Sequence, residues 1–151
     1  MRSNTFAITA PIVLRLRATE SIDHEAHVVW RLGFAEAPEV EDGVESRLVF
    51  GNLHASGIHG WADVDVRARF VNTSALPAET PVADLLKGAA AAETLYDFAR
   101  SHVLGILATV GAHVEVPVKA PEPEIKPLRP PSEEEVAEAL EDATDVAAEE
   151  E

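Results

Sequence analysis

The first 72 residues alternate between apolar and polar side chains with a period of two, which is typical of strands that bury one face. Four runs show the pattern: residues 5–18, 24–35, 45–56 and 61–71. Asp42-Gly43 and the sequence GIHG at residues 57–60 favour tight hairpin connections between runs. The pattern predicts an α+β protein whose strands form a four-stranded antiparallel meander covered on one face only.

The apolar positions of these runs predict which side chains face the covering layer. The even positions of residues 6–16 are apolar, and the third run places Phe50 inward. Gly51-Asn52 breaks the alternation of the third run, which indicates a bulge or bend. Pro11 has no amide hydrogen to donate, which indicates an edge strand or a bulge.

A helical pattern begins near residue 90 and continues to about residue 110. Its back consists of Asp97, Ser101, Leu104 and Ala108, and two of these four residues are apolar. One sheet covers only one side of a helix, so we expect the other side to pack against a second copy in a homo-oligomer, a dimer or tetramer. The interface candidates are Leu95, Phe98, His102, Val103, Leu104, Ile106 and Leu107.

Residues 95–118, LYDFARSHVLGILATVGAHVEVPV, resemble the SecB-like chaperone family, and the order of strands and helix extends the resemblance over residues 5–121. The matching residues are Phe98, Ala99, Arg100, Gly111 and Pro117. The chain departs from the pattern at Asp97, where the family usually has a proline, and at Ser101, where it often has a glutamate. Arg100 either ties the proline-containing crossover between the strands and the helix, or a neighbouring subunit, through carboxylates, or it extends along the surface.

The resemblance implies a homotetramer, a dimer of dimers with the long helices between two sheets. It also implies a chaperone that uses neither nucleotide nor metal and holds unfolded polypeptide, a preprotein or an antitoxin, in long apolar grooves. The large apolar residues of the sheet pack in the core unless they extend past the helix, where they would contact the client. The candidates for client or partner contact are Trp30, Phe34, Phe50, Trp61, Val114, Val116 and Val118.

The formal net charge of −15 is unevenly distributed, since residues 122–151 contain 12 acidic and two basic residues. Such a surface repels nucleic acid and anionic membranes. The chain has no cysteine, which excludes disulfides and thiol catalysis. Arg15 and Arg17 interrupt the apolar run near the N-terminus, so we expect neither a signal peptide nor direct membrane insertion, and a cytoplasmic protein.

Proline content and charge divide the chain into a SecB-like body of residues 1–121, a proline-rich linker of residues 122–131 and an acidic tail of residues 132–151. Ser132 and Glu135 form a capping box, which predicts an amphipathic helix in the tail. The tail is either a solvated, partly helical segment or a helix that docks into its own groove or onto a partner. Its docking candidates are Val136, Leu140 and Ala143.

The sequence contains no catalytic signature, neither a G-x-S-x-G elbow nor a phosphate-binding loop. Asp63 and Asp65 share a strand face with Arg67 and Arg69, which favours ion pairs among them over acid–base chemistry. His24 and His27 would face opposite sides of a strand, which disfavours a shared metal ion. His102 is either a buried, hydrogen-bonded histidine or a pH-sensitive element. We therefore expect no catalytic, cofactor-binding or metal-binding residues.

These features predict a non-enzymatic, chaperone-like protein that binds unfolded or partly folded polypeptide on apolar grooves of an oligomer. The alternative is a structural or assembly protein, for instance a virion or scaffold component, that uses the same fold to oligomerise and the acidic tail to dock. The chain has only eight aromatic residues, which favours a narrow range of partners over a general one.

Overall fold

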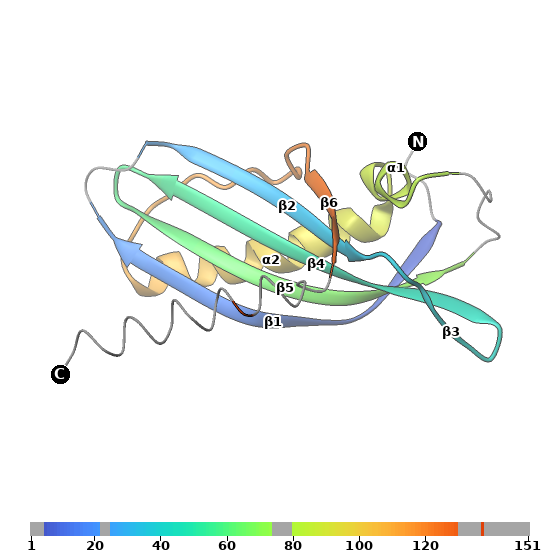
Figure 1. The fold of residues 1–151 in the computed structure, drawn as a ribbon. Coiled ribbons are helices and arrows are strands. Elements are labelled where there is room, and N and C mark those ends of the chain that lie inside the picture. The colour runs from blue at the N-terminus through green and yellow to red at the C-terminus, as the bar shows by residue number, and fades with distance from the viewer. Residues whose placement is uncertain (1–4, 22–24, 74–79, 130–136, 138–151) are drawn as a thin grey trace.

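The computed structural model describes residues 5–21, 25–73, 80–129 and residue 137. Within these residues the chain forms one mixed sheet and two helices (Figure 1). In chain order the elements are β1 (Phe6–Glu20), β2 (His27–Ala35), β3 (Glu39–Glu41), β4 (Val44–Gly57), β5 (Gly60–Asn72), α1 (Val82–Lys87), α2 (Ala90–Thr109) and β6 (Glu124–Leu128). The predicted α+β class and the long helix after the strands are confirmed.

The strands follow the order β1-β5-β4-β2-β6, so β1 pairs with β5 and not with β2. This order is a Greek-key arrangement, and the predicted meander is wrong. Just after β1, the Ser21 amide donates to the His59 carbonyl in the turn of the β4–β5 hairpin at 3.2 Å. Near it, the Ser56 hydroxyl donates to the Glu25 carbonyl at 2.8 Å. Alternation along a strand identifies its faces but not its neighbours, so the sequence pattern could not distinguish the two orders.

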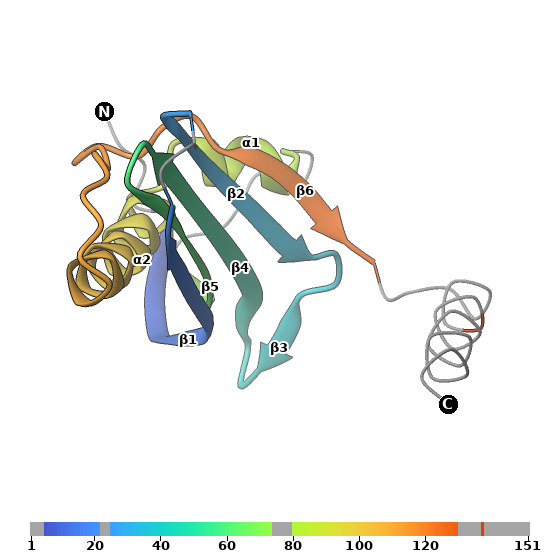
Figure 2. The same cartoon turned by 90° about the vertical axis from the view of Figure 1, so that its left-hand side faces the viewer.

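Two further strands make the sheet larger than predicted and not purely antiparallel. β3 pairs with β4 through the predicted hairpin turn, in which Asp42 and Gly43 have φ angles of 51° and 76°. β6 pairs in parallel with β2 and ends the sheet beyond it (Figure 2). β6 comes from the segment predicted as a proline-rich linker. Pro127 is compatible with a strand at the sheet's edge, where one side of the backbone needs no partner.

β1 is an edge strand that contains two irregularities in its pairing with β5, one at Ala10 and Pro11 and one at Leu14. Ala10 has a φ angle of 48°, and the edge position and the bulge predicted from Pro11 are both present. A register shift moves the following side chains to the other face of the sheet. Ile12 and Leu14, predicted to face the core, are therefore 39% and 48% exposed.

α2 lies across one face of the sheet and contacts β1, β4 and β5 (Figure 2). The alternation predicted for β5 is confirmed, because its even-numbered residues 62–70 are buried beneath this helix. In β4 the buried positions are instead the odd ones, including Val49 and Leu53. The prediction that Phe50 faces inward is wrong, since it lies on the face opposite α2.

Trp30 joins β2 to the helix, since its ring meets the Tyr96 ring edge-on with 5.5 Å between centroids. Gly51 makes room for this contact. A Cβ atom at Gly51 would lie 2.9 Å from Trp30 Cζ3 and 3.0 Å from Val66 Cγ2. The pairing of β4 continues through Gly51 and Asn52 on both sides, so the bend predicted there is wrong. The glycine serves close packing and not a change of strand direction.

The segment after α2 is attached to the helix by two side chains. Gly111 ends the helix with a φ angle of 72°, as predicted for a left-handed C-terminal cap. The Tyr96 hydroxyl then donates to the Pro117 carbonyl at 2.6 Å, and Arg100 Nε donates to the Val116 carbonyl at 3.2 Å. Burial raises the pKa of Tyr96 above its ordinary value, against an opposing effect of Arg100. Arg100 thus ties the segment after α2 through a backbone carbonyl, whereas one reading predicted a bond to a carboxylate of the crossover or of a neighbouring subunit.

The predicted tail-docking residues Val136, Leu140 and Ala143 lie outside the described residues. The boundary predicted between linker and tail, at residue 131, lies outside them as well. Among the described helices, α2 is the longest, and neither it nor α1 combines the length and apolar character that a bilayer span requires.

Candidate functional site

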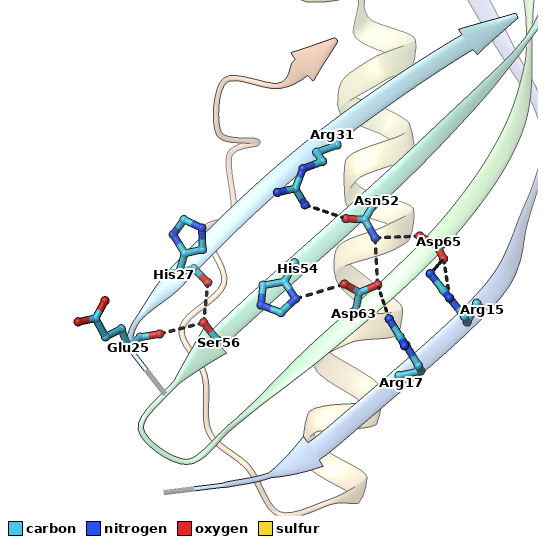
Figure 3. A network of polar contacts seen from close by, with 10 residues as sticks. All are labelled: Arg15, Arg17, Glu25, His27, Arg31, Asn52, His54, Ser56, Asp63 and Asp65. Carbon is cyan, nitrogen blue, oxygen red and sulfur yellow. Dashed lines mark hydrogen bonds and ion pairs between the residues drawn. The ribbon is translucent and has the colours of Figure 1, made fainter. Parts of the chain in front are cut away.

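The face of the sheet opposite α2, here called the outer face, carries a polar network and an apolar hollow. Residues paired across neighbouring antiparallel strands share a face, which places Phe50 with Arg67 and Asn52 with Asp65. Figure 3 shows this face with α2 behind the sheet.

Asn52 is the centre of the polar network (Figure 3). Its Nδ2 donates to Asp63 Oδ1 at 2.9 Å and to Asp65 Oδ1 at 2.8 Å, and its Oδ1 accepts from Arg31 at 3.3 Å. Arg15 Nε donates to Asp65 Oδ2 at 2.7 Å. These bonds link β1, β2, β4 and β5 across the outer face, so the network fixes the register of the strands.

The second carboxylate of the network is engaged in a similar way. Asp63 Oδ2 lies 3.2 Å from His54 Nδ1, and Asp63 Oδ1 lies 3.9 Å from Arg17. The Trp61 ring stacks on His54 with 6.0 Å between centroids, and Arg17 lies 5.9 Å from its centroid. Asp65 and Asp63 thus form ion pairs with Arg15 and Arg17 of β1, whereas the sequence indicated pairing with Arg67 and Arg69 of their own strand. In the described part of the chain, no three His, Asp or Glu side chains gather as metal ligands.

Beside the network lies the outer hollow, an open concavity with a volume of about 420 Å³. Its lining residues are Leu14, Arg31, Leu32, Gly33, Phe50, Gly51, Asn52, Asp65, Val66, Glu124, Lys126 and Leu128. Its accessible apolar side chains come from three separate places in the chain, Leu14 on β1, Phe50 on β4 and Leu128 on β6, whereas Leu32 and Val66 of the lining are buried. Leu14 and Leu128 are 48% and 44% exposed, so much of their apolar surface remains open to water.

Gly33 shapes the hollow by its lack of a side chain. A Cβ atom at Gly33 would lie 2.8 Å from Leu128 Cδ1, so Leu128 packs directly on the backbone of β2. On the same side, Arg31 Nε donates to Glu124 Oε2 at 3.2 Å and closes one part of the rim. The result is an apolar floor with charged residues around it, a composition suited to an extended chain with apolar side chains.

α2 also carries apolar side chains that the sheet covers only in part or not at all. Phe98 and His102 contact each other edge-on at 4.7 Å between centroids, and Leu104 is 36% exposed. Phe98, His102 and Ile106 are half-buried, so these four predicted interface residues remain accessible. The other three, Leu95, Val103 and Leu107, are at most 2% exposed because the sheet of their own chain covers them. Placing these three at an interface was wrong.

The predicted client contacts separate into buried and accessible residues. Trp30 and Phe34 are 1% and 7% exposed and belong to the core, as do Val114 and Val116 of the segment after α2. None of these four is available to a client. Val118 lies beyond them and is 76% exposed. Phe50 lines the outer hollow and Trp61 belongs to the polar network.

Sequence reasoning missed Leu14, Gly33 and Leu128 as parts of this surface. Pro11 gave a usable signal, since a bulge there reverses the faces of the residues that follow it. No local pattern identified Leu128, because its place depends on the pairing of β6 with β2, nearly 100 residues earlier in the chain.

No protein-family model matches the chain, and no curated protein matches it. Among solved structures, the chain is similar to the Mycobacterium tuberculosis SecB-like chaperone Rv1957 in complex with a ChAD peptide from the Rv1956 HigA1 antitoxin. The sequence identity is 20% and the TM-score is 0.43, and the match covers 72% of this chain and 84% of that chain. This solved structure is of a SecB-like chaperone, the family that residues 95–118 resemble.

Proposed function

We propose that this protein is a non-enzymatic, chaperone-like protein that binds an extended segment of polypeptide in the outer hollow. The observation that carries the proposal is the open apolar floor formed by Leu14 and Phe50 on the face that α2 leaves uncovered, beside β6. Exposed apolar surfaces of this kind mark binding sites, because leaving them in water is unfavourable.

The size of the hollow supports an extended and not a folded partner. About 420 Å³ accommodates a few side chains, and the flanking charges leave no broad apolar plane. An unfolded preprotein or an antitoxin segment offers apolar side chains on an extended backbone and fits this geometry. The small number of aromatic residues favours a narrow set of partners.

The proposal includes a homo-oligomer, a dimer or a tetramer, assembled through the exposed side of α2. Leu104 is exposed there, Phe98 is half-buried at the flank of the helix, and Gly105 has open space beside it, which permits close approach of a second helix. In a symmetric oligomer, each copy would present its own outer hollow on the side away from the helices.

Suppression of aggregation tests the proposed function. Reduced lactalbumin is allowed to aggregate with equimolar full-length protein, and turbidity is followed over time. We expect the wild type to delay aggregation and Leu14→Asn to delay it less. Ile58→Asn is the matched control, because Ile58 is 64% exposed but lies at the β4–β5 turn outside the hollow. Unchanged turbidity with the wild type contradicts the proposal.

A further inference from the structure

The outer edge of the sheet is occupied by a strand that is weakly attached. β6 has five residues, and only Ile125 among them is partly buried. Pro127 donates no backbone hydrogen bond. The two ion pairs that accompany β6 join Arg31 to Glu124 and Arg129 to Glu36, and all four side chains are at least half exposed. Exposed ion pairs of this kind contribute little to stability.

The segment that leads into β6 also lies over a hollow and is not packed closely on its underside. Residues 119–123 border a second hollow of about 340 Å³, whose other walls come from α1, the start of α2 and Trp30. The last firm attachment before this segment is the pair of bonds from Tyr96 and Arg100 to the carbonyls of Pro117 and Val116. If β6 left β2, it would lose the partial packing of Ile125 against the core and its contacts with α1, while the bonds from Tyr96 and Arg100 would remain.

β6 borders the outer hollow with side chains that are mostly charged. Its residues alternate between the two faces, and those that line the hollow are Glu124, Lys126 and Leu128. Two of these three are charged, beside a floor formed by Phe50 and Leu14. A strand with apolar side chains at all three positions would bury more apolar surface on the same floor.

We propose that β6 pairs with the edge of β2 when no client is bound, and that a client binds by replacing it. The client is an extended segment with apolar side chains at every second position. Its backbone pairs with residues 31–35 of β2, and its apolar side chains cover Gly33 and Phe50. This inference rests on the proposed function and adds the regulation of that site: the C-terminal strand lowers affinity for weak clients by competing with them.

A reversible crosslink tests the replacement in the full-length protein. Arg31 and Glu124 are register partners in β2 and β6, and the chain has no cysteine of its own. Arg31→Cys with Glu124→Cys therefore allows only one intramolecular disulfide, which holds β6 in place. Val40→Cys with Glu45→Cys is the matched control, because it joins register partners of β3 and β4 outside the hollow.

The probe is a fluorescein-labelled peptide of about ten residues in which leucine alternates with serine, and its binding is followed by fluorescence anisotropy. We expect the oxidised Arg31–Glu124 pair variant to bind at least about tenfold more weakly than the same protein after reduction. The control pair should bind equally in both states. Ile125→Gly, which removes the one partly buried side chain of β6, should bind several-fold more tightly than the wild type.

The outcomes separate this inference from the proposed function. Equal affinity of the oxidised and reduced forms, with the disulfide verified by mass spectrometry, overturns the replacement while leaving the proposed function in place. A disulfide that does not form without peptide contradicts the position of β6 on β2. If neither the wild type nor Ile125→Gly binds the peptide, the proposed function fails, and the replacement fails with it.

Discussion

Leu104→Asp tests whether the exposed side of α2 is the surface through which copies of the chain assemble. Leu104 is 36% exposed in the single chain and points away from the sheet, so the substitution leaves the core unchanged. In an oligomer the new carboxylate would be buried without a partner, which costs about 3–5 kcal/mol. That cost weakens association by a factor between roughly 10² and 10⁴.

The assay is sedimentation velocity over a range of protein concentrations, with circular dichroism to verify the strand content. We expect the wild type to sediment as an oligomer and Leu104→Asp as a monomer with the same spectrum. Thr94→Asp is the matched control, because it adds the same charge on the exposed side of the same helix, near its N-terminus. Negative charge is favourable there.

The smaller change Leu104→Ala removes apolar surface without adding a charge. Burying the exposed third of a leucine contributes on the order of 0.5–1 kcal/mol, so this variant should dissociate only at low concentration. If Leu104→Asp remains fully assembled, this side of α2 faces water in solution, and the account of the helix as an interface is refuted.

Two further substitutions test the interior. Tyr96→Phe keeps the ring against Trp30 but loses the bond to the Pro117 carbonyl, so urea unfolding at neutral pH should show a loss of about 1 kcal/mol. The pKa of Tyr96 is raised in the folded protein, so above about pH 10 the tyrosine of the unfolded chain ionises first. The wild type should therefore lose stability as the pH rises through this range, and Tyr96→Phe should lose less stability over the same range. Gly51→Ala places a methyl group against the Trp30 ring and should lower the free energy of unfolding by about 1–3 kcal/mol, whereas an unchanged midpoint would argue against this close contact.

The parts of the fold that depend on short-range patterns followed from the sequence. The even positions of β5 are buried because a strand alternates its faces, and Gly111 ends α2 because a left-handed residue there suits glycine. Pairings between distant segments did not follow. β1 lies beside β5, and β6 lies beside β2, because of long-range packing, which the local alternation of apolar and polar residues does not encode.

The candidate site was predictable only in part, for the same reason. Phe50 was a candidate contact, and it lines the hollow, although it was expected to face the core unless it extended past the helix. Leu14 was predicted to face the core because the alternation of side chains was followed as if the strand were regular. The bulge at Pro11 reverses which face the residues after it occupy. Trp30 was a candidate for its size, but Gly51 gives it a buried place against Tyr96.

Binding of an alternating leucine–serine peptide to the full-length protein is the measurement that tests the central claim most directly. We predict saturable binding to the wild type, equal binding to Ile58→Asn, and affinity about fivefold to tenfold lower for Leu14→Asn, since that variant loses roughly half of a leucine's burial. Equal affinity of all three proteins, or no binding by the wild type, would contradict the claim that the outer hollow holds a polypeptide.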